Sequence, residues 1–229
     1  LRPPRESRLF NAITLGDGYV GLNINPRPPG RPAGLDHFGI EVDDAEATRA
    51  RMSERYPHTG VLKRPANRAF AGYTTHDPDG NIVDIHQRNM ANRGEIYAEN
   101  DWEQDTTFTH YAVRTMDPEA VARFYVDVFD LDTANTLGGE RSIHLTDGRM
   151  TLVLSRWRIG DFARTGIVRP GPDHVCFRVP DVDALKSHLE AVMDENPHLA
   201  PRSLGIGREN RVRREIFADR RVREALGYA

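Results

Sequence analysis

The 229-residue sequence has little of the features that mark several classes of protein. Its single cysteine excludes an intrachain disulfide framework and is typical of a reducing, intracellular setting. No apolar run approaches the roughly 18 residues of a membrane-spanning helix. The 31 basic and 34 acidic side chains nearly balance, so no broad field of one sign favours nucleic acid or an anionic membrane. We therefore expect a cytoplasmic globular protein that binds neither nucleic acid nor a membrane.

One short pattern occurs three times along the chain. In each copy a histidine opens a stretch of alternating residues, and an aspartate follows seven positions later; the histidine–aspartate pairs are His37 and Asp44, His110 and Asp117, and His174 and Asp181. The alternation predicts a strand with the histidine on the face opposite the apolar row. Aspartate is a good N-cap, so a helix is expected after each strand, over 45–56, 118–131 and 182–193. Three histidines on the non-core faces of related strands are the main functional clue.

Aspartate–glycine turns give the remaining elements of the repeat. We expect hairpins within 9–25, within 70–86 and within 142–155, around Asp17-Gly18, Asp77-Pro78-Asp79-Gly80 and Asp147-Gly148. The repeated unit is therefore a strand, a helix and a set of strands closed by a turn, and it divides the chain into a domain over 1–88, a linker over 89–106 and a domain over 107–229. We find no opening strand and helix in the first domain. The second has no closing Asp-Pro-Asp-Gly hairpin and ends in an arginine-rich tail after Pro201.

These motifs resemble those of the vicinal oxygen chelate superfamily, which contains glyoxalases, bleomycin-resistance proteins and extradiol dioxygenases. The resemblance is carried by the histidine-to-aspartate strand signature, by Phe124-Tyr125 with 129–131 in the second helix, and by the run from His76 to Asp84. It implies an α+β fold of tandem βαβββ modules whose curved sheets form open barrels.

The resemblance also implies a metal site. In metal-dependent members, the ligands are the histidine of an opening strand and a carboxylate of a closing strand. Carried over, the ligand positions are His37, His110, His174 and Asp84, where the family usually has glutamate at the last position. Two imidazoles and one carboxylate leave coordination positions open for substrate oxygens. The implied cofactor is a divalent metal, preferably Fe(II), with Mn, Zn, Ni or Co as alternatives.

A third ligand for the His110–His174 pair is not evident from the sequence, since Glu209, Glu215 and Glu224 lie in no matching motif. The alternative for this pair is a structural relic that lines a polar cavity. His144 shares a strand face with Ser142, so it is a candidate acid or base near a substrate, or simply a residue that lines the sheet. Cys176 lies on the His174 face, where a small inert side chain is favoured over a coordinating thiol.

His76 and His86 are expected to be turn and surface residues. The leading interpretation of the whole chain is a ring-cleaving dioxygenase of the extradiol type, acting on a small aromatic diol. One alternative is a glyoxalase-like isomerase, epimerase or lyase with Glu41 as a candidate base. Another is a non-enzymatic protein that binds an aromatic antibiotic. Open sheet edges favour a homodimer.

Overall fold

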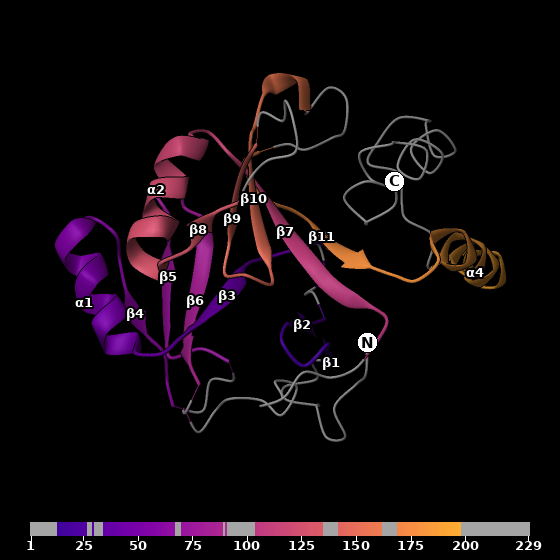
Figure 1. Cartoon of the computed structure of the whole chain (residues 1–229), viewed down its shortest axis with the longest axis horizontal. Helices are drawn as coiled ribbons and strands as arrows, with labels where there is room; N and C mark the ends of the chain where they lie inside the picture. The colour runs from indigo at the N-terminus through magenta and orange to yellow at the C-terminus, as the bar shows by residue number, and fades with distance from the viewer. Residues whose placement is uncertain are drawn as a thin grey trace.

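The computed structural model describes residues 13–26, 29, 34–66, 70–88, 90, 104–134, 142–161 and 169–197. This part of the chain is α+β, with a two-stranded, a four-stranded and a five-stranded sheet (Figure 1). The elements are β1 Ile13–Gly16, β2 Gly21–Ile24, β3 Phe38–Val42, α1 Ala45–Arg55, β4 Leu62–Lys63, β5 Tyr73–His76, β6 Ile82–Gln87, β7 Thr107–Thr115, α2 Pro118–Phe129, β8 Asp132–Thr133, β9 Ile143–Thr146, β10 Thr151–Arg156, β11 Gly171–Arg178 and α4 Val182–Glu195. Figure 1 shows α1 and α2 next to each other on one side of the molecule and α4 apart from both.

Two complete βαβββ modules make up the centre of the chain. The first runs from β3 through α1 to β6, and the second from β7 through α2 to β10. Their sheets have the same strand order, β3-β6-β5-β4 and β7-β10-β9-β8, and in each the first and last strands of the module pair in parallel. The β1–β2 hairpin precedes these modules, and β11 with α4 follows them. The α+β fold of tandem βαβββ modules predicted from the sequence is confirmed.

The aspartates that follow the three repeated strands fix the starts of the helices. Each side chain accepts a hydrogen bond from the backbone N–H three residues later; the pairs are Asp44 with Ala47 at 2.9 Å, Asp117 with Ala120 at 3.0 Å and Asp181 with Ala184 at 2.8 Å. This satisfies one of the N–H groups that have no partner inside a helix. The regular interval between histidine and aspartate therefore sets the junction between strand and helix in all three repeats.

The aspartate–glycine turns also share one geometry. One carboxylate oxygen of Asp17, Asp77 or Asp147 accepts two backbone N–H groups, at 2.7 to 3.0 Å. The glycines of these turns have φ of +90° (Gly18), +83° (Gly80) and +94° (Gly148), a conformation that side chains with a Cβ rarely adopt. The same local chemistry thus closes three hairpins, β1–β2, β5–β6 and β9–β10.

One hydrophobic core spans both modules. Met52, Val83 and Ile85 of the first module belong to the same buried cluster as Val113 and Phe124 of the second.

Polar contacts reinforce this junction between the modules. The Tyr56 hydroxyl donates to Asp127 at 2.8 Å, between α1 and α2. The buried Tyr125 hydroxyl donates to Asp77 at 3.2 Å. These hydrogen bonds add to the apolar surface that the two modules bury against each other in the shared core.

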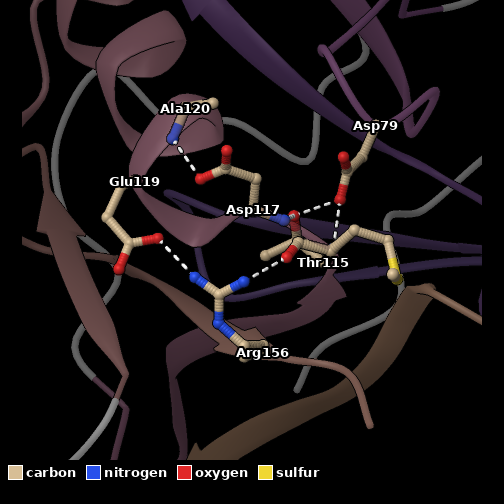
Figure 2. Close-up of polar contacts among 7 residues, drawn as sticks. Asp79, Thr115, Asp117, Glu119, Ala120 and Arg156 are labelled. Atoms are coloured by element: carbon tan, nitrogen blue, oxygen red, sulfur yellow. Dashed lines mark hydrogen bonds and ion pairs between the residues drawn. The ribbon is translucent and has the colours of Figure 1, made fainter.

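The closing turn of the first module contacts the start of α2 (Figure 2). The carboxylate of Asp79 accepts hydrogen bonds from the Thr115 hydroxyl and from the backbone N–H of Met116. Beside it, Arg156 donates to the Met116 carbonyl at 2.6 Å and to Glu119 at 2.8 Å. The Asp-Pro-Asp-Gly motif thus has two functions, because its first aspartate shapes the turn and its second binds the next module.

Three features differ from the sequence-based expectation or lie beyond it. The two-residue strands β4 and β8 were not predicted, since two residues show no alternation. His86, expected at the surface, is only 5% exposed. Most of the predicted linker 89–106 and the arginine-rich tail after Pro201 lie outside the described residues. Within the described ranges, no helix is long and apolar enough to cross a bilayer.

Candidate functional site

The pairing of β7 with β11 brings two of the signature histidines together. The strands are antiparallel, with His174 opposite Ala112 and Cys176 opposite His110. Each histidine therefore lies opposite the residue two positions after the other histidine, and all four side chains belong to one face of the sheet. Because β11 continues the sheet outside β7, backbone pairing rather than a loop sets this arrangement.

His110 and His174 direct the same ring nitrogen at each other. Their Nε2 atoms are 3.1 Å apart, and the ring planes are inclined by 77°. Two imidazole nitrogens bound to one ion each lie about 2.0–2.1 Å from it. When the nitrogen–metal–nitrogen angle lies between a right angle and the tetrahedral angle, the two nitrogens are about 2.9–3.4 Å apart. The pair therefore fits two adjacent coordination positions of one divalent metal ion.

The surroundings keep His110 uncharged. Burial, followed by repulsion of a positive charge by the nearby His174 and His144, lowers the pKa of His110 to about 4. A neutral imidazole is the form that binds a metal, so the ring of His110 needs no net loss of a proton near neutral pH.

The His110–His174 pair supplies only two of the protein ligands that a closed metal site needs. Among the residues that the structure describes, no group of three or more histidine, cysteine, aspartate or glutamate side chains is placed to hold an ion. The three glutamates considered from the sequence, Glu209, Glu215 and Glu224, lie outside the described residues.

Asp173 is a site residue that the sequence reasoning missed. Its Oδ2 lies 3.3 Å from Nδ1 of His174 and accepts a hydrogen bond from Nε of Arg114 at 2.9 Å. Burial would raise the pKa of Asp173, but the hydrogen bond from His174 and the charge of Arg114 outweigh it and hold that pKa below its usual value. A signal was present in the sequence, because the same aspartate–histidine dipeptide occurs at Asp36-His37.

His144 lies on the same face, two strands away from β7. It is opposite Val153 of β10, which in turn is opposite Ala112 of β7. His144 is half-buried and close enough to influence the pKa of His110. Cys176 is 7% exposed, and burial raises the pKa of its thiol, so its small side chain is protonated at neutral pH.

In the first module, the structure brings His37 and Asp84 together. Nε2 of His37 lies 3.2 Å from Oδ2 of Asp84, whose other oxygen accepts a hydrogen bond from Thr74. The hydrogen bond to Asp84 is the main reason that the pKa of His37 is raised, and Asp36, 3.3 Å from Nδ1, adds to it. Gly39 is opposite Asp84 and lets the two strands approach closely, since a Cβ there would lie 3.2 Å from the Asp84 carbonyl oxygen.

Three other polar residues of the first module have contacts or a buried position of their own. Glu41, the candidate base of the isomerase alternative, lies 3.3 Å from Nε of Arg88. His76, expected in a turn at the surface, is instead the half-buried last residue of β5: its Nδ1 lies 2.9 Å from the Asp77 carbonyl oxygen, and its Nε2 accepts from the Gly60 N–H at 3.3 Å. His86 is buried on the strand that carries Asp84, because β6 is covered on both faces.

No protein-family model and no curated protein sequence matches the chain, whereas solved structures do. A variant of 4-hydroxymandelate synthase from Streptomyces coelicolor is 17% identical, with a TM-score of 0.55 over 79% of this chain and 62% of that one. The Mn(II)-bound glyoxalase from Novosphingobium aromaticivorans is 16% identical, with a TM-score of 0.52 over 83% of this chain and 62% of that one. BphC, a halotolerant catechol dioxygenase, is 12% identical, with a TM-score of 0.52 over 82% and 66%. The chain spans less than two thirds of each of these structures, and at such identities the likeness is one of fold.

Proposed function

The chain has the fold of the vicinal oxygen chelate superfamily, and from this premise we propose that it is a metal-dependent oxygenase of the extradiol ring-cleaving type. Its substrate would be a small aromatic diol, whose two adjacent oxygens can bind one ion together. The names of two similar structures, a catechol dioxygenase and a 4-hydroxymandelate synthase, support an aromatic substrate for this chain.

The observation that carries the proposal is the 3.1 Å separation of the two Nε2 atoms of His110 and His174, together with the neutral state of His110. These two residues would hold the ion, preferably Fe(II), with Mn, Zn, Ni or Co as alternatives. Once bound, Fe(II) would supply Lewis-acid and redox chemistry toward a chelating diol. Strand residues hold such ligands in place better than loop residues do.

We assign His144 the role of an acid or base toward the substrate. It lies in the same row of the sheet as His174, separated from it by Ala112 and Val153, so a molecule bound at the histidine pair would extend toward it across small side chains. An imidazole can take the proton of a phenolic hydroxyl near neutral pH. A His144→Gln variant should retain the metal and lose most of the turnover.

His37 and Asp84 are a second, weaker candidate for a metal position. The pair offers one imidazole and one carboxylate, but the two groups already bind each other at 3.2 Å, so an ion would have to replace this contact. The competition predicts a lower affinity than at the His110–His174 pair.

The first test is the metal content per chain after reconstitution with Fe(II) under anaerobic conditions. We expect near-stoichiometric iron in the wild type and in His37→Ala, and loss of the iron in His110→Ala/His174→Ala. Oxygen consumption with a panel of catechols then tests the reaction. A metal-loaded protein that leaves every catechol unchanged would contradict the ring-cleaving activity, and a protein that never takes up metal would contradict the site itself.

We further propose that the protein is a homodimer. In the described part of the chain, β3 and β11 are edge strands of their sheets, and exposed edges tend to pair with another chain. Sedimentation equilibrium tests this, and a monomer at high micromolar concentration would contradict it.

A further inference from the structure

His174 needs more than its strand position to face His110. Its side chain is 54% exposed, so packing alone leaves several rotamers open to it. Fixing an exposed side chain in one rotamer costs conformational entropy. Some specific contact must therefore select the orientation that places Nε2 3.1 Å from Nε2 of His110.

The pairing of β11 with β7 contains an irregularity next to this histidine. Pro172 is opposite Val113 and His174 is opposite Ala112, so Asp173 is an extra residue in the ladder, with no residue of β7 directly opposite it. A bulge of this kind redirects side chains that would otherwise alternate between the two faces. Pro172 suits the position, because proline lacks an N–H and is tolerated at bulges and on edge strands.

As a result, the Asp173 carboxylate reaches two groups of the histidine face. It lies 3.3 Å from Nδ1 of His174 and accepts from Nε of Arg114 at 2.9 Å, and the Asp173 side chain is 16% exposed. Arg114 is four positions after His110 on β7 and is opposite Gly171, just before the bulge. The carboxylate is therefore held from one strand while it contacts the histidine of the other.

We propose that Asp173, redirected by the bulge and held by Arg114, is the positioning residue that orients His174 and keeps the proton of its ring on Nδ1. A carboxylate can only accept at that position, so Nδ1 carries the hydrogen and Nε2 presents its lone pair toward His110. In the metal-free protein, Nε2–H of His110 donates to Nε2 of His174. The inference rests on the proposed metal site only for its consequence, since the tautomer exists without metal.

Long-range ¹H–¹⁵N NMR of the histidine rings in metal-free protein tests the orientation directly. We expect the Nδ1–H tautomer for His174 in the wild type and a mixture of tautomers in Asp173→Ala. Cobalt(II), titrated in competition with a coloured chelator, tests the consequence: its affinity should fall about 10- to 100-fold in Asp173→Ala and by a smaller factor in Arg114→Gln. Asp173→Asn retains an acceptor of the same shape, so it should keep the tautomer and lose less affinity.

Asp127→Ala is the matched control, because it removes another arginine-paired carboxylate that lies between α1 and α2, away from the histidines. It should leave both the tautomer and the cobalt affinity unchanged. An Nε2–H tautomer of His174 in the wild type would overturn the inference, as would an Asp173→Ala protein that binds cobalt within twofold of the wild type. If the wild type binds no cobalt while His174 still shows the Asp173-dependent tautomer, the orientation stands and the metal site is what fails.

Discussion

Asp79 and Thr115 are hydrogen-bonded across the junction of the two modules. Asp79 lies in the turn between β5 and β6, and Thr115 is the fully buried last residue of β7. Since the same carboxylate also accepts from the backbone of Met116, it fixes the segment that leads into α2 (Figure 2). The closing motif of one module therefore holds the segment that leads to the N-cap Asp117 of the next module's helix.

Asp79→Ala should destabilise the protein by about 1–3 kcal/mol, because it leaves the buried Thr115 hydroxyl and the Met116 N–H without their acceptor. Urea unfolding measures this change. Glu119→Ala, which removes an exposed partner of Arg156, should cost less than about 0.5 kcal/mol. Equal effects of the two substitutions would contradict the role given to Asp79.

The His37–Asp84 pair should make stability depend on pH. The pKa of His37 is higher in the folded chain than in the unfolded chain, mainly because of the hydrogen bond to Asp84. Its contribution is therefore complete below the unfolded pKa of about 6.5 and is lost as the pH rises through the folded pKa.

Urea unfolding of wild type and His37→Gln at about pH 5.5 and pH 9 tests this dependence. The free energy of unfolding of the wild type should exceed that of the variant at both pH values, and by roughly 1 kcal/mol more at pH 5.5 than at pH 9, as expected for a partly buried ion pair. A difference that is the same at both pH values would show that the pair contributes no charge-dependent stability.

His110 should have the opposite effect. Burial lowers its pKa from 6.5 to about 4, so the unfolded chain binds more protons than the folded chain between these values. Stability therefore falls as the pH decreases through this range. Metal-free His110→Asn should lose less stability than the wild type between about pH 7 and pH 4.5, by roughly 2 kcal/mol. Parallel pH profiles for the two proteins would contradict the low pKa.

The shared core predicts that the two modules unfold together. Phe124→Ala removes a fully buried ring of the second module and should cost about 3–5 kcal/mol. Because Met52 and Ile85 belong to the same cluster, amides of β6 in the first module should lose protection from hydrogen exchange to the same extent as amides of β10. Protection that persists in β6 alone would indicate that the first module is stable independently.

Local chemistry explains why much of the fold could be predicted from the sequence. Asp44, Asp117 and Asp181 each act through a backbone N–H three residues away, and such short-range contacts are encoded in the spacing. The alternating pattern likewise placed His110 and His174 on the same kind of face, which the strand pairing confirms.

The parts that could not be predicted depend on how separate segments meet. The role of Asp79 requires the position of a second module, and that of Asp173 requires a bulge that appears only when β11 pairs with β7. The burial of His86 has the same origin, since an alternating pattern shows which residues share a face and not what covers that face.

The register of β7 and β11 places the two histidines at neighbouring positions on one face of the sheet, and the contact with Asp173 then orients the ring of His174. A shift of one residue between these strands would turn the His174 side chain to the opposite side of the sheet and separate the pair completely. Changes in loop length elsewhere would leave the separation intact. Strand pairing, and not the length of any loop, therefore keeps the two side chains on one face of the sheet.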